Sequence, residues 1–291
     1  MVVTVPEEHA KTRLDSFVVA NVPLLSRAFA QKLCDEGVVL VNGKANKAGY
    51  KLHAGDLVDI QYDVSELDAI PEIDIPVLYE DDDCVVMNKP VGVLTHTQGR
   101  FNLEATVATF LRSRMAESET MEGERAGVVH RLDRATSGVM IGAKNQQAMS
   151  ILQKQFAQRK VKKTYMAIVA GHVDQPEAVI DMPIERNPKA PATFRVGLNG
   201  KSAVTHYIVV RETEHYTLLE LKPETGRTHQ LRVHLAKIGH PIIGDSVYGS
   251  GTYGDRLYLH ALSLEITLPS RERKVFTAPL PNEFEELLDE D

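Results

Sequence analysis

A single carboxylate in residues 130–138 is placed for chemistry. The segment reads His-Arg-Leu-Asp-Arg-Ala-Thr-Ser-Gly, so Asp133 stands between Arg131 and Arg134 and just ahead of a predicted tight turn. Two neighbouring guanidinium groups favour the charged form of an aspartate even in a cleft that excludes water. A carboxylate held in this way can act as a nucleophile. Taken alone, the segment also fits an aspartate that caps a turn while two arginines face solvent, so the choice depends on other motifs.

Five further segments carry charged, aromatic or glycine residues at fixed places. They are Cys84–His96 with Asn88-Lys89-Pro90 inside it, Lys163-Thr164-Tyr165, residues 225–234 (Thr-Gly-Arg-Thr-His-Gln-Leu-Arg-Val-His), residues 239–245 (Gly-His-Pro-Ile-Ile-Gly-Asp) and Tyr248-Gly249. In this order the segments resemble the RluA-type family of pseudouridine synthases. The resemblance covers about residues 75–280, and several separate motifs in one order make a chance match implausible.

The resemblance gives three residues roles in catalysis. Asp133 is the catalytic aspartate, and three routes stay open for it: attack on the sugar carbon, attack on the base, or removal of a sugar proton. Arg227 is expected to pair with Asp133, because a bidentate arginine holds a carboxylate in one direction and in its charged form better than a lysine does. A phosphate contact is the alternative role for Arg227. Tyr165 is expected to stack on the target uracil, although an aromatic residue in a strand also suits a core.

The resemblance assigns two further residues to the substrate. Leu231 is expected to close the other side of the uracil pocket. Arg131 matches a position that, in relatives, helps to displace the target nucleotide from its stack, and a backbone phosphate contact is the alternative. Pseudouridine formation involves neither oxidation nor hydrolysis, so no metal or organic cofactor is expected. His229 and His234 are five residues apart, which does not suit a helical metal site, so they are expected to be hydrogen-bonded scaffold.

Strand-like runs outnumber helical ones in the segment that carries these motifs. Apolar runs predict strands at 138–143, 165–169, 202–210, 216–221 and 258–268, and apolar residues at helical spacing predict helices at 148–158 and 230–237. These elements do not alternate as strict strand–helix–strand units, so they favour an α+β fold over a doubly wound one. The resemblance implies a mixed, mainly antiparallel central sheet with a catalytic cleft, the pseudouridine synthase fold.

Residues 11–62 have the pattern of a small separate module. Two short amphipathic helices are predicted at 13–19 and 25–33, the second beginning near Ser26 as its cap. A β run over 38–44 ends in the hairpin pair Asn42-Gly43, and an alternating run at 52–60 follows. This order resembles the α/β RNA-binding module named after ribosomal protein S-four. Its expected RNA contacts, with ordinary surface charge as the alternative for each, are Arg27, Lys32, Lys44 and Lys47.

Acidic residues divide the chain. Residues 63–83 carry nine acidic groups with no Lys or Arg, and residues 283–291 carry six more. The expected order is therefore the module at 11–62, an acidic linker at 63–83, the catalytic domain at 84–280 and an acidic tail at 281–291. Outside the two acidic segments, 25 acidic residues face 33 Lys and Arg. A surface for phosphate is thus available despite the net charge of −7.

One short basic run is a candidate for that surface. It contains Lys154, Arg159, Lys160, Lys162 and Lys163. A run of this kind can bind phosphate groups, and the alternative is an ordinary solvated face.

Composition limits the class of protein. A chain of 291 residues with 43% apolar residues can bury a sizeable core and suits two domains. Cys34 and Cys84 are isolated, which predicts neither a disulfide framework nor a thiolate metal site. The sequence shows no signal peptide and no apolar run of the roughly 18 residues that a membrane span needs. We therefore expect a cytoplasmic protein, and we expect a monomer.

The predicted function is the isomerisation of specific uridines in structured RNA to pseudouridine. Large-subunit ribosomal RNA is the first expected target, because the amino-terminal module favours a large structured substrate, and transfer RNA is the second. Two other classes stay open. A glycosidase-like hydrolase also uses carboxylates at a sugar carbon, but it needs two cooperating groups. A noncatalytic RNA-binding or ribosome-assembly factor would use the amino-terminal module alone.

Overall fold

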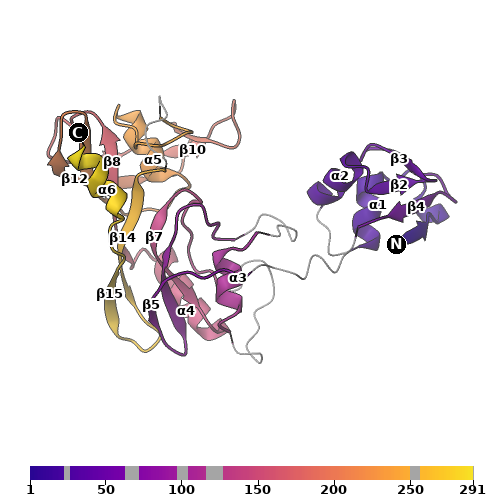
Figure 1. Cartoon of the computed structure of the whole chain (residues 1–291), viewed down its shortest axis with the longest axis horizontal. Helices are drawn as coiled ribbons and strands as arrows, with labels where there is room; N and C mark the ends of the chain where they lie inside the picture. Colours follow the sequence, from indigo (N-terminus) through magenta and orange to yellow (C-terminus); the bar gives the residue numbers. More distant parts are fainter. Residues whose placement is uncertain (23–26, 63–71, 97–103, 116–126, 250–255, 291) are drawn as a thin grey trace. The chain divides into compact units, whose positions relative to one another are not determined.

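The structure is a computed structural model that describes residues 1–22, 27–62, 72–96, 104–115, 127–249 and 256–290. The chain forms two compact units (Figure 1). Met1–Glu72 belong to the smaller unit, while Ile73–His96 and Thr106–Asp291 belong to the larger one. Among the described residues, no helix is both long and apolar enough to cross a membrane.

The smaller unit contains two helices and a four-stranded antiparallel sheet. The helices are α1 (Leu14–Asn21) and α2 (Arg27–Asp35), and the strands follow the order β1 (Val2–Thr4), β4 (Leu57–Ile60), β2 (Val39–Val41) and β3 (Lys44–Ala45). Asn42 and Gly43 both have positive φ values, 50° and 76°, as a two-residue hairpin turn between right-twisted strands requires. The two helices and the hairpin predicted from sequence are confirmed, while the expected cap Ser26 lies outside the described residues.

A nine-stranded sheet forms the centre of the larger unit. Its strands follow the order β5 (Val77–Glu80), β6 (Cys84–Lys89), β7 (Ser137–Ala143), β14 (Leu259–Thr267), β8 (Lys162–Ala170), β13 (Tyr216–Pro223), β12 (Val204–Glu212) and β9 (Glu177–Asp181), with β15 (Arg273–Thr277) paired to β14. Only β7 and β14 run parallel among these pairs. Strands β10 (Ile184–Arg186) and β11 (Phe194–Val196) form a separate hairpin. The prediction of an α+β fold with a mixed, mainly antiparallel sheet is confirmed.

Two hydrophobic cores pack against the sheet, and both include residues of β14, which pairs with β7 at the junction between them. Helices α3 (Val107–Arg112) and α4 (Gln146–Ala157) pack with β6 and β7 in one core. Helices α5 (Gln230–Lys237) and α6 (Asn282–Asp289) pack with β8 and β13 in the other. Figure 1 shows α3 and α4 beside β5 and β7, and α5 and α6 beside β8 and β12. The segment 130–136, which carries Asp133, leads into β7 at this junction.

Two of the expected boundaries are wrong. Strand β5 lies inside the expected linker 63–83 and pairs with β6, and Ile75 before it is completely buried. The Asp81 carboxylate accepts hydrogen bonds from the backbone nitrogens of Asp83 and Cys84 and so closes the β5–β6 turn. Asp81 therefore belongs to the folded sheet and not to a linker. The larger unit therefore begins before residue 84. Linker residues 63–71 lie outside the described residues.

The expected acidic tail 281–291 forms helix α6 over most of its length. Phe284 and Leu288 are 0% and 1% exposed within the core of the β8–β13 half. They are four residues apart, so both lie on one face of the helix while the acidic residues occupy the other faces.

Candidate active site

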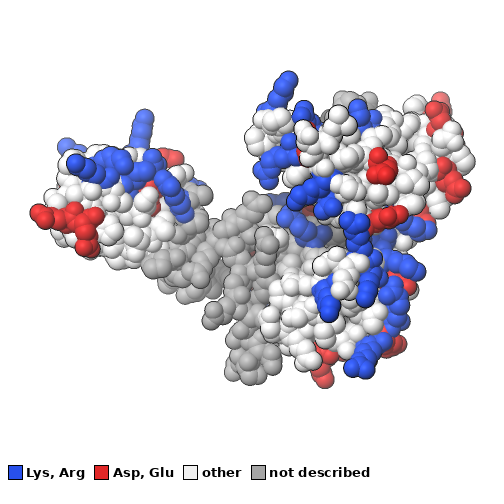
Figure 2. Space-filling model, turned by 180° about the vertical axis from the view of Figure 1, so that it is seen from behind, with Lys and Arg blue, Asp and Glu red and all other residues white. Residues whose placement is uncertain are grey.

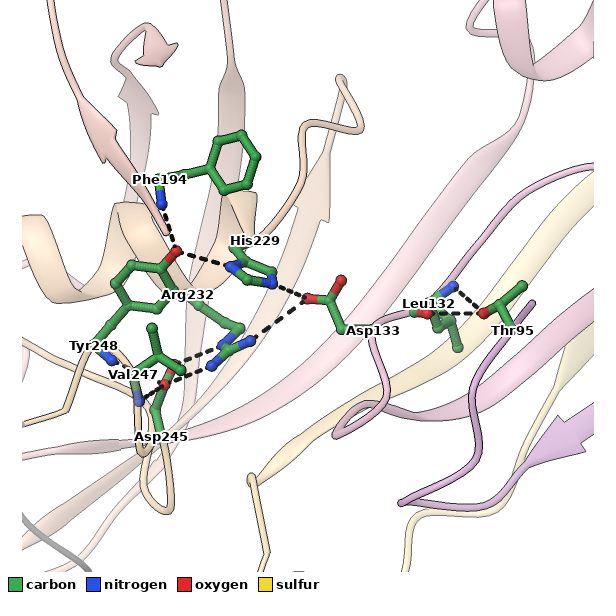
Figure 3. A network of polar contacts seen from close by, with 9 residues as sticks. All are labelled: Thr95, Leu132, Asp133, Phe194, His229, Arg232, Asp245, Val247 and Tyr248. Atoms are coloured by element: carbon green, nitrogen blue, oxygen red, sulfur yellow. Dashed lines mark hydrogen bonds and ion pairs between the residues drawn. The ribbon is translucent and has the colours of Figure 1, made fainter. Parts of the chain in front are cut away.

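The backbone before β7 is fixed on both sides of Asp133. The hydroxyl of Thr95 donates to the carbonyl of Leu132 at 2.8 Å (Figure 3). The backbone nitrogen of Thr136 donates to the carbonyl of Asp133 at 3.0 Å and closes the turn predicted there. The Asp133 carboxylate is thus presented by a short segment with little freedom to move.

A buried lysine supports the same turn from the next strand. Lys89 is completely buried, and its Nζ donates to the carbonyls of Pro90, Val93 and Arg134 at 2.8, 2.9 and 3.4 Å. Burial lowers the pKa of Lys89 to about 7, although the charge of Asp133 acts to raise it. Lys89 therefore connects the end of β6 to the turn of Asp133.

Two cation-forming groups lie near Asp133, Arg232 in helix α5 and His229 directly before that helix. Arg232 Nη1 and His229 Nε2 each lie 3.8 Å from Asp133 Oδ2 (Figure 3). The Arg232 distance fits an ion pair, the His229 distance fits one only when the ring is protonated, and both exceed the length of a hydrogen bond. Oδ1 makes no hydrogen bond or ion pair with any described residue, and the Asp133 side chain is 20% exposed. The carboxylate is therefore oriented through one oxygen while the other is left for a reaction partner.

Asp245 determines the position of Arg232. Its two carboxylate oxygens accept from Arg232 Nη2 and Nε at 2.7 Å each, and both residues are buried. Burial acts to lower the pKa of Arg232, but the bonds to Asp245 outweigh it and raise that pKa. Burial likewise acts to raise the pKa of Asp245, and Arg232 outweighs it and lowers that pKa. Arg232 is therefore a fixed positive charge that faces two carboxylates.

Tyr248 holds His229 in the site. Its hydroxyl lies 2.8 Å from His229 Nδ1 and accepts a hydrogen bond from the backbone nitrogen of Phe194 at 2.9 Å (Figure 3). Because the Tyr248 hydroxyl already accepts from Phe194, it can donate its own proton to His229 Nδ1, which would leave the ring proton on Nε2, facing Asp133. Burial lowers the pKa of His229, partly opposed by Asp133. His229 is therefore hydrogen-bonded as expected, and it also faces the Asp133 carboxylate.

A buried amide builds the start of α5. The Gln230 side chain accepts from the hydroxyl of Thr225 at 2.7 Å and the backbone nitrogen of Arg227 at 3.0 Å, and it donates to the Val204 carbonyl at 3.0 Å. His229, just before the helix, has a left-handed φ of 56°. These bonds anchor the helix to β12 and so aim its first turn at Asp133.

The prediction that Arg227 pairs with Asp133 is wrong. Arg227 Nε donates instead to the Ser202 carbonyl at 3.0 Å. Its backbone is tied to Gln230 ahead of the helix, whereas Arg232 lies in the first turn of α5 and projects toward Asp133. Spacing alone does not distinguish two arginines in one motif. The only sequence signal for Arg232 is its place in the same motif, with Asp245 in the next.

One pocket brings together the residues predicted for the catalytic part. Its volume is about 460 Å³, and its lining includes Asp133, Tyr165, Leu231, Arg131 and Arg227. Burial and the charge of Asp133 raise the pKa of Tyr165, so its hydroxyl stays protonated. Leu231 is 7% exposed and presents an apolar surface. The pocket thus combines a carboxylate, an aromatic residue and an aliphatic residue.

The RNA contacts predicted for the smaller unit have different surroundings. Arg27 Nε contacts Asp15 Oδ2 at 3.2 Å, where it helps to neutralise a completely buried carboxylate. Lys32 lies 3.6 Å from Glu36, while Lys44 is exposed on the hairpin. These three contacts, and that of Lys47, stay predictions.

Comparisons with known proteins agree with this architecture. Residues 83–237 match the RNA pseudouridylate synthase family, and residues 12–58 match the S4 domain. The chain is 37% identical to an uncharacterized RNA pseudouridine synthase of Bacillus subtilis, over 99% of this chain and 96% of that protein. It is 34% identical to ribosomal large subunit pseudouridine synthase C of Vibrio parahaemolyticus, over 98% and 95%.

A solved structure shares the fold. Human RNA pseudouridylate synthase domain containing 1 superposes with a TM-score of 0.59 at 31% identity, over 72% of this chain and 85% of that one. The present chain belongs to the RNA pseudouridylate synthase family and carries an S4 domain at its amino-terminal end. It is an RNA pseudouridine synthase, as its sequence predicts.

Proposed function

We propose that this enzyme converts uridines of large-subunit ribosomal RNA to pseudouridine in the cytoplasm, with Asp133 as the catalytic carboxylate. The main support is the geometry of Asp133 in the pocket. Arg232 and His229 hold one carboxylate oxygen, and the other is unpaired among the described residues. The ribosomal target is supported by the name of the relative from Vibrio parahaemolyticus, and transfer RNA is the second candidate.

The chemistry fits these side chains. The reaction breaks the bond from the ribose to N1 of uracil, forms a bond from the ribose to C5, and moves the proton of C5 to N1, so atoms and charge balance. Asp133 Oδ1 reacts with the sugar or the base, or takes a sugar proton. Arg232 and His229 orient the carboxylate, and Arg232 is therefore a positioning residue. We propose that Tyr165 and Leu231 hold the flat uracil while it turns.

The test is a transcriptome-wide pseudouridine map in cells that lack the gene. The cells are rescued with the wild type, with Asp133→Asn, or with Asp174→Asn as a control at an exposed carboxylate outside the pocket. We expect sites in large-subunit ribosomal RNA to vanish and to return with the wild type and Asp174→Asn only. If the sites that vanish lie only in transfer RNA, transfer RNA would be the target instead of ribosomal RNA. Full restoration of the sites by Asp133→Asn would show that Asp133 is not the catalytic carboxylate.

A further inference from the structure

A second groove continues from the catalytic pocket across the sheet. It has a volume of about 950 Å³ and is lined by residues of β8, β9, β12, β13, β14 and β15. The two cavities share Arg159, Val161, Lys163, Pro223 and Glu224. Figure 2 shows Lys and Arg side chains gathered where this face of the larger unit is hollowed. A chain that entered the catalytic pocket could thus continue into the groove past two shared cations.

Lys163 is an ammonium group at this junction that has no counterion among the described residues. It precedes Tyr165 by two residues on β8, so both side chains lie on the same face of the strand. Its Nζ makes no hydrogen bond or ion pair with any described residue, and it lies beside the backbone of Gly226. Burial lowers the pKa of Lys163 to about 8. A partly buried charge of this kind is unfavourable until an anion joins it.

Arg159 is the second cation at the junction. It follows the end of α4 with a φ of 56°, where glycine is the usual residue because its lack of Cβ removes the steric cost. Its guanidinium likewise has no hydrogen-bond or ion-pair partner in the described parts of the chain. The exposed Arg159 side chain lines both cavities and is thus available to a ligand at their junction.

Two of the acidic groups that line the groove are already paired. Glu224 lies 2.6 Å from His206, and Glu265 contacts Lys162 and Arg273 at 3.3 and 2.7 Å. His130, which also lines the catalytic pocket, is neutral at physiological pH because burial and the charge of Lys163 lower its pKa to about 3. Among the described residues, neither Glu224 nor Glu265 forms an ion pair with Lys163 or Arg159.

We propose that Lys163 and Arg159 bind a backbone phosphate of the substrate RNA beside the target uridine, where the strand passes from the catalytic pocket into the groove. This inference rests on the proposed function for the identity of the RNA. The proposal also gives different roles to the five residues of the basic run found in the sequence. Lys154 and Lys160 line neither cavity, and Lys162 is paired with Glu265, so only two of the five residues bind this phosphate.

The test measures how tightly the full chain binds a labelled twelve-nucleotide oligouridylate. The measurement is repeated between 50 and 300 mM KCl, at concentrations spaced roughly evenly in log[salt]. The variants are Lys163→Met, Lys163→Arg and, as a matched control, the exposed Lys154→Met. Each lost phosphate contact lowers the slope of log K against log[salt] by about 0.7 for a single strand. We expect Lys163→Met to weaken binding about tenfold and to lose this increment. Lys163→Arg should keep the slope, and Lys154→Met should change neither quantity.

Thermal unfolding of Lys163→Met separates binding from folding. Because the variant removes an unpaired, partly buried charge, we expect its melting temperature to equal or exceed that of the wild type. An unchanged salt slope in Lys163→Met, with or without weaker binding, would overturn the proposal. A fall in melting temperature together with an unchanged slope would assign Lys163 to the fold instead. Binding needs no turnover, so these outcomes are independent of whether pseudouridine forms.

Discussion

At the scale of single residues, the site depends on an arginine shared by two carboxylates. Asp245 binds Arg232 through two short hydrogen bonds, and the third nitrogen of the guanidinium lies 3.8 Å from Asp133. A bidentate contact of this kind uses the rigid fork of arginine, which lysine lacks. The orientation of Asp133 therefore follows from a residue that the substrate need not touch.

The first prediction compares the two arginines of the motif. Arg232→Lys should lower kcat/KM at least about 100-fold, because it releases the orientation of Asp133. Arg227→Lys should lower it less than about tenfold, because Arg227 contacts the Ser202 carbonyl and its ammonium replacement can still do so. Both are measured with the RNA identified by the pseudouridine map. A larger loss in Arg227→Lys than in Arg232→Lys would restore Arg227 as the partner of Asp133.

At the scale of elements, the site depends on the parallel contact between β7 and β14. Gly138 has a φ of 118°, and a Cβ on it would collide with the backbone of Ala261 on β14. The glycine allows the two strands to approach directly after the turn that carries Asp133. The Thr-Ser-Gly end of the central motif is thus required by packing as well as by the turn.

The second prediction therefore compares two glycines with positive φ. Gly138→Ala should lower the free energy of unfolding by about 3 kcal/mol, from backbone strain together with the clash. Gly171→Ala should lower it by only about 1 kcal/mol, because φ is positive there too but no atom lies within 4 Å of the added methyl group. Urea denaturation measures both. Equal losses would show that backbone conformation alone decides the cost.

At the scale of the whole molecule, buried neutral histidines make stability depend on pH. His260 is completely buried on β14, and burial lowers its pKa from 6.5 to about 4. The unfolded chain binds a proton below pH 6.5, whereas the folded chain does not until about pH 4. The stabilisation is therefore complete above pH 6.5 and is lost as the pH falls toward 4.

The third prediction uses this window. Between pH 7.5 and 5.5, His260 should contribute a loss of about 1.4 kcal/mol to the free energy of unfolding, since one pH unit of this range lies below the unfolded pKa. His260→Gln should show a pH dependence that is smaller by this amount, whatever its stability at pH 7.5. Urea denaturation at the two pH values gives the difference. An unchanged dependence would mean that His260 is protonated equally in both states.

The sequence by itself determined the order of the motifs, and that order indicated the family, the fold class and Asp133. Periodicity also predicted α4, α5 and the strands β7, β8, β12, β13 and β14, because apolar spacing reports which face an element buries. Composition misled at β5 and α6, since acidic residues on the exposed face of a packed element look like those of a linker or a tail.

Only the tertiary structure decided which residues meet Asp133. Arg227 and Arg232 are equally plausible in one motif, and the choice depends on how Gln230 anchors the start of α5 and on Asp245 some 13 residues away. Likewise, only the packed sheet shows that Lys163 and Arg159 lie between two cavities while Lys154 does not. A linear sequence records neighbours along the chain, whereas charge and burial act between neighbours in space.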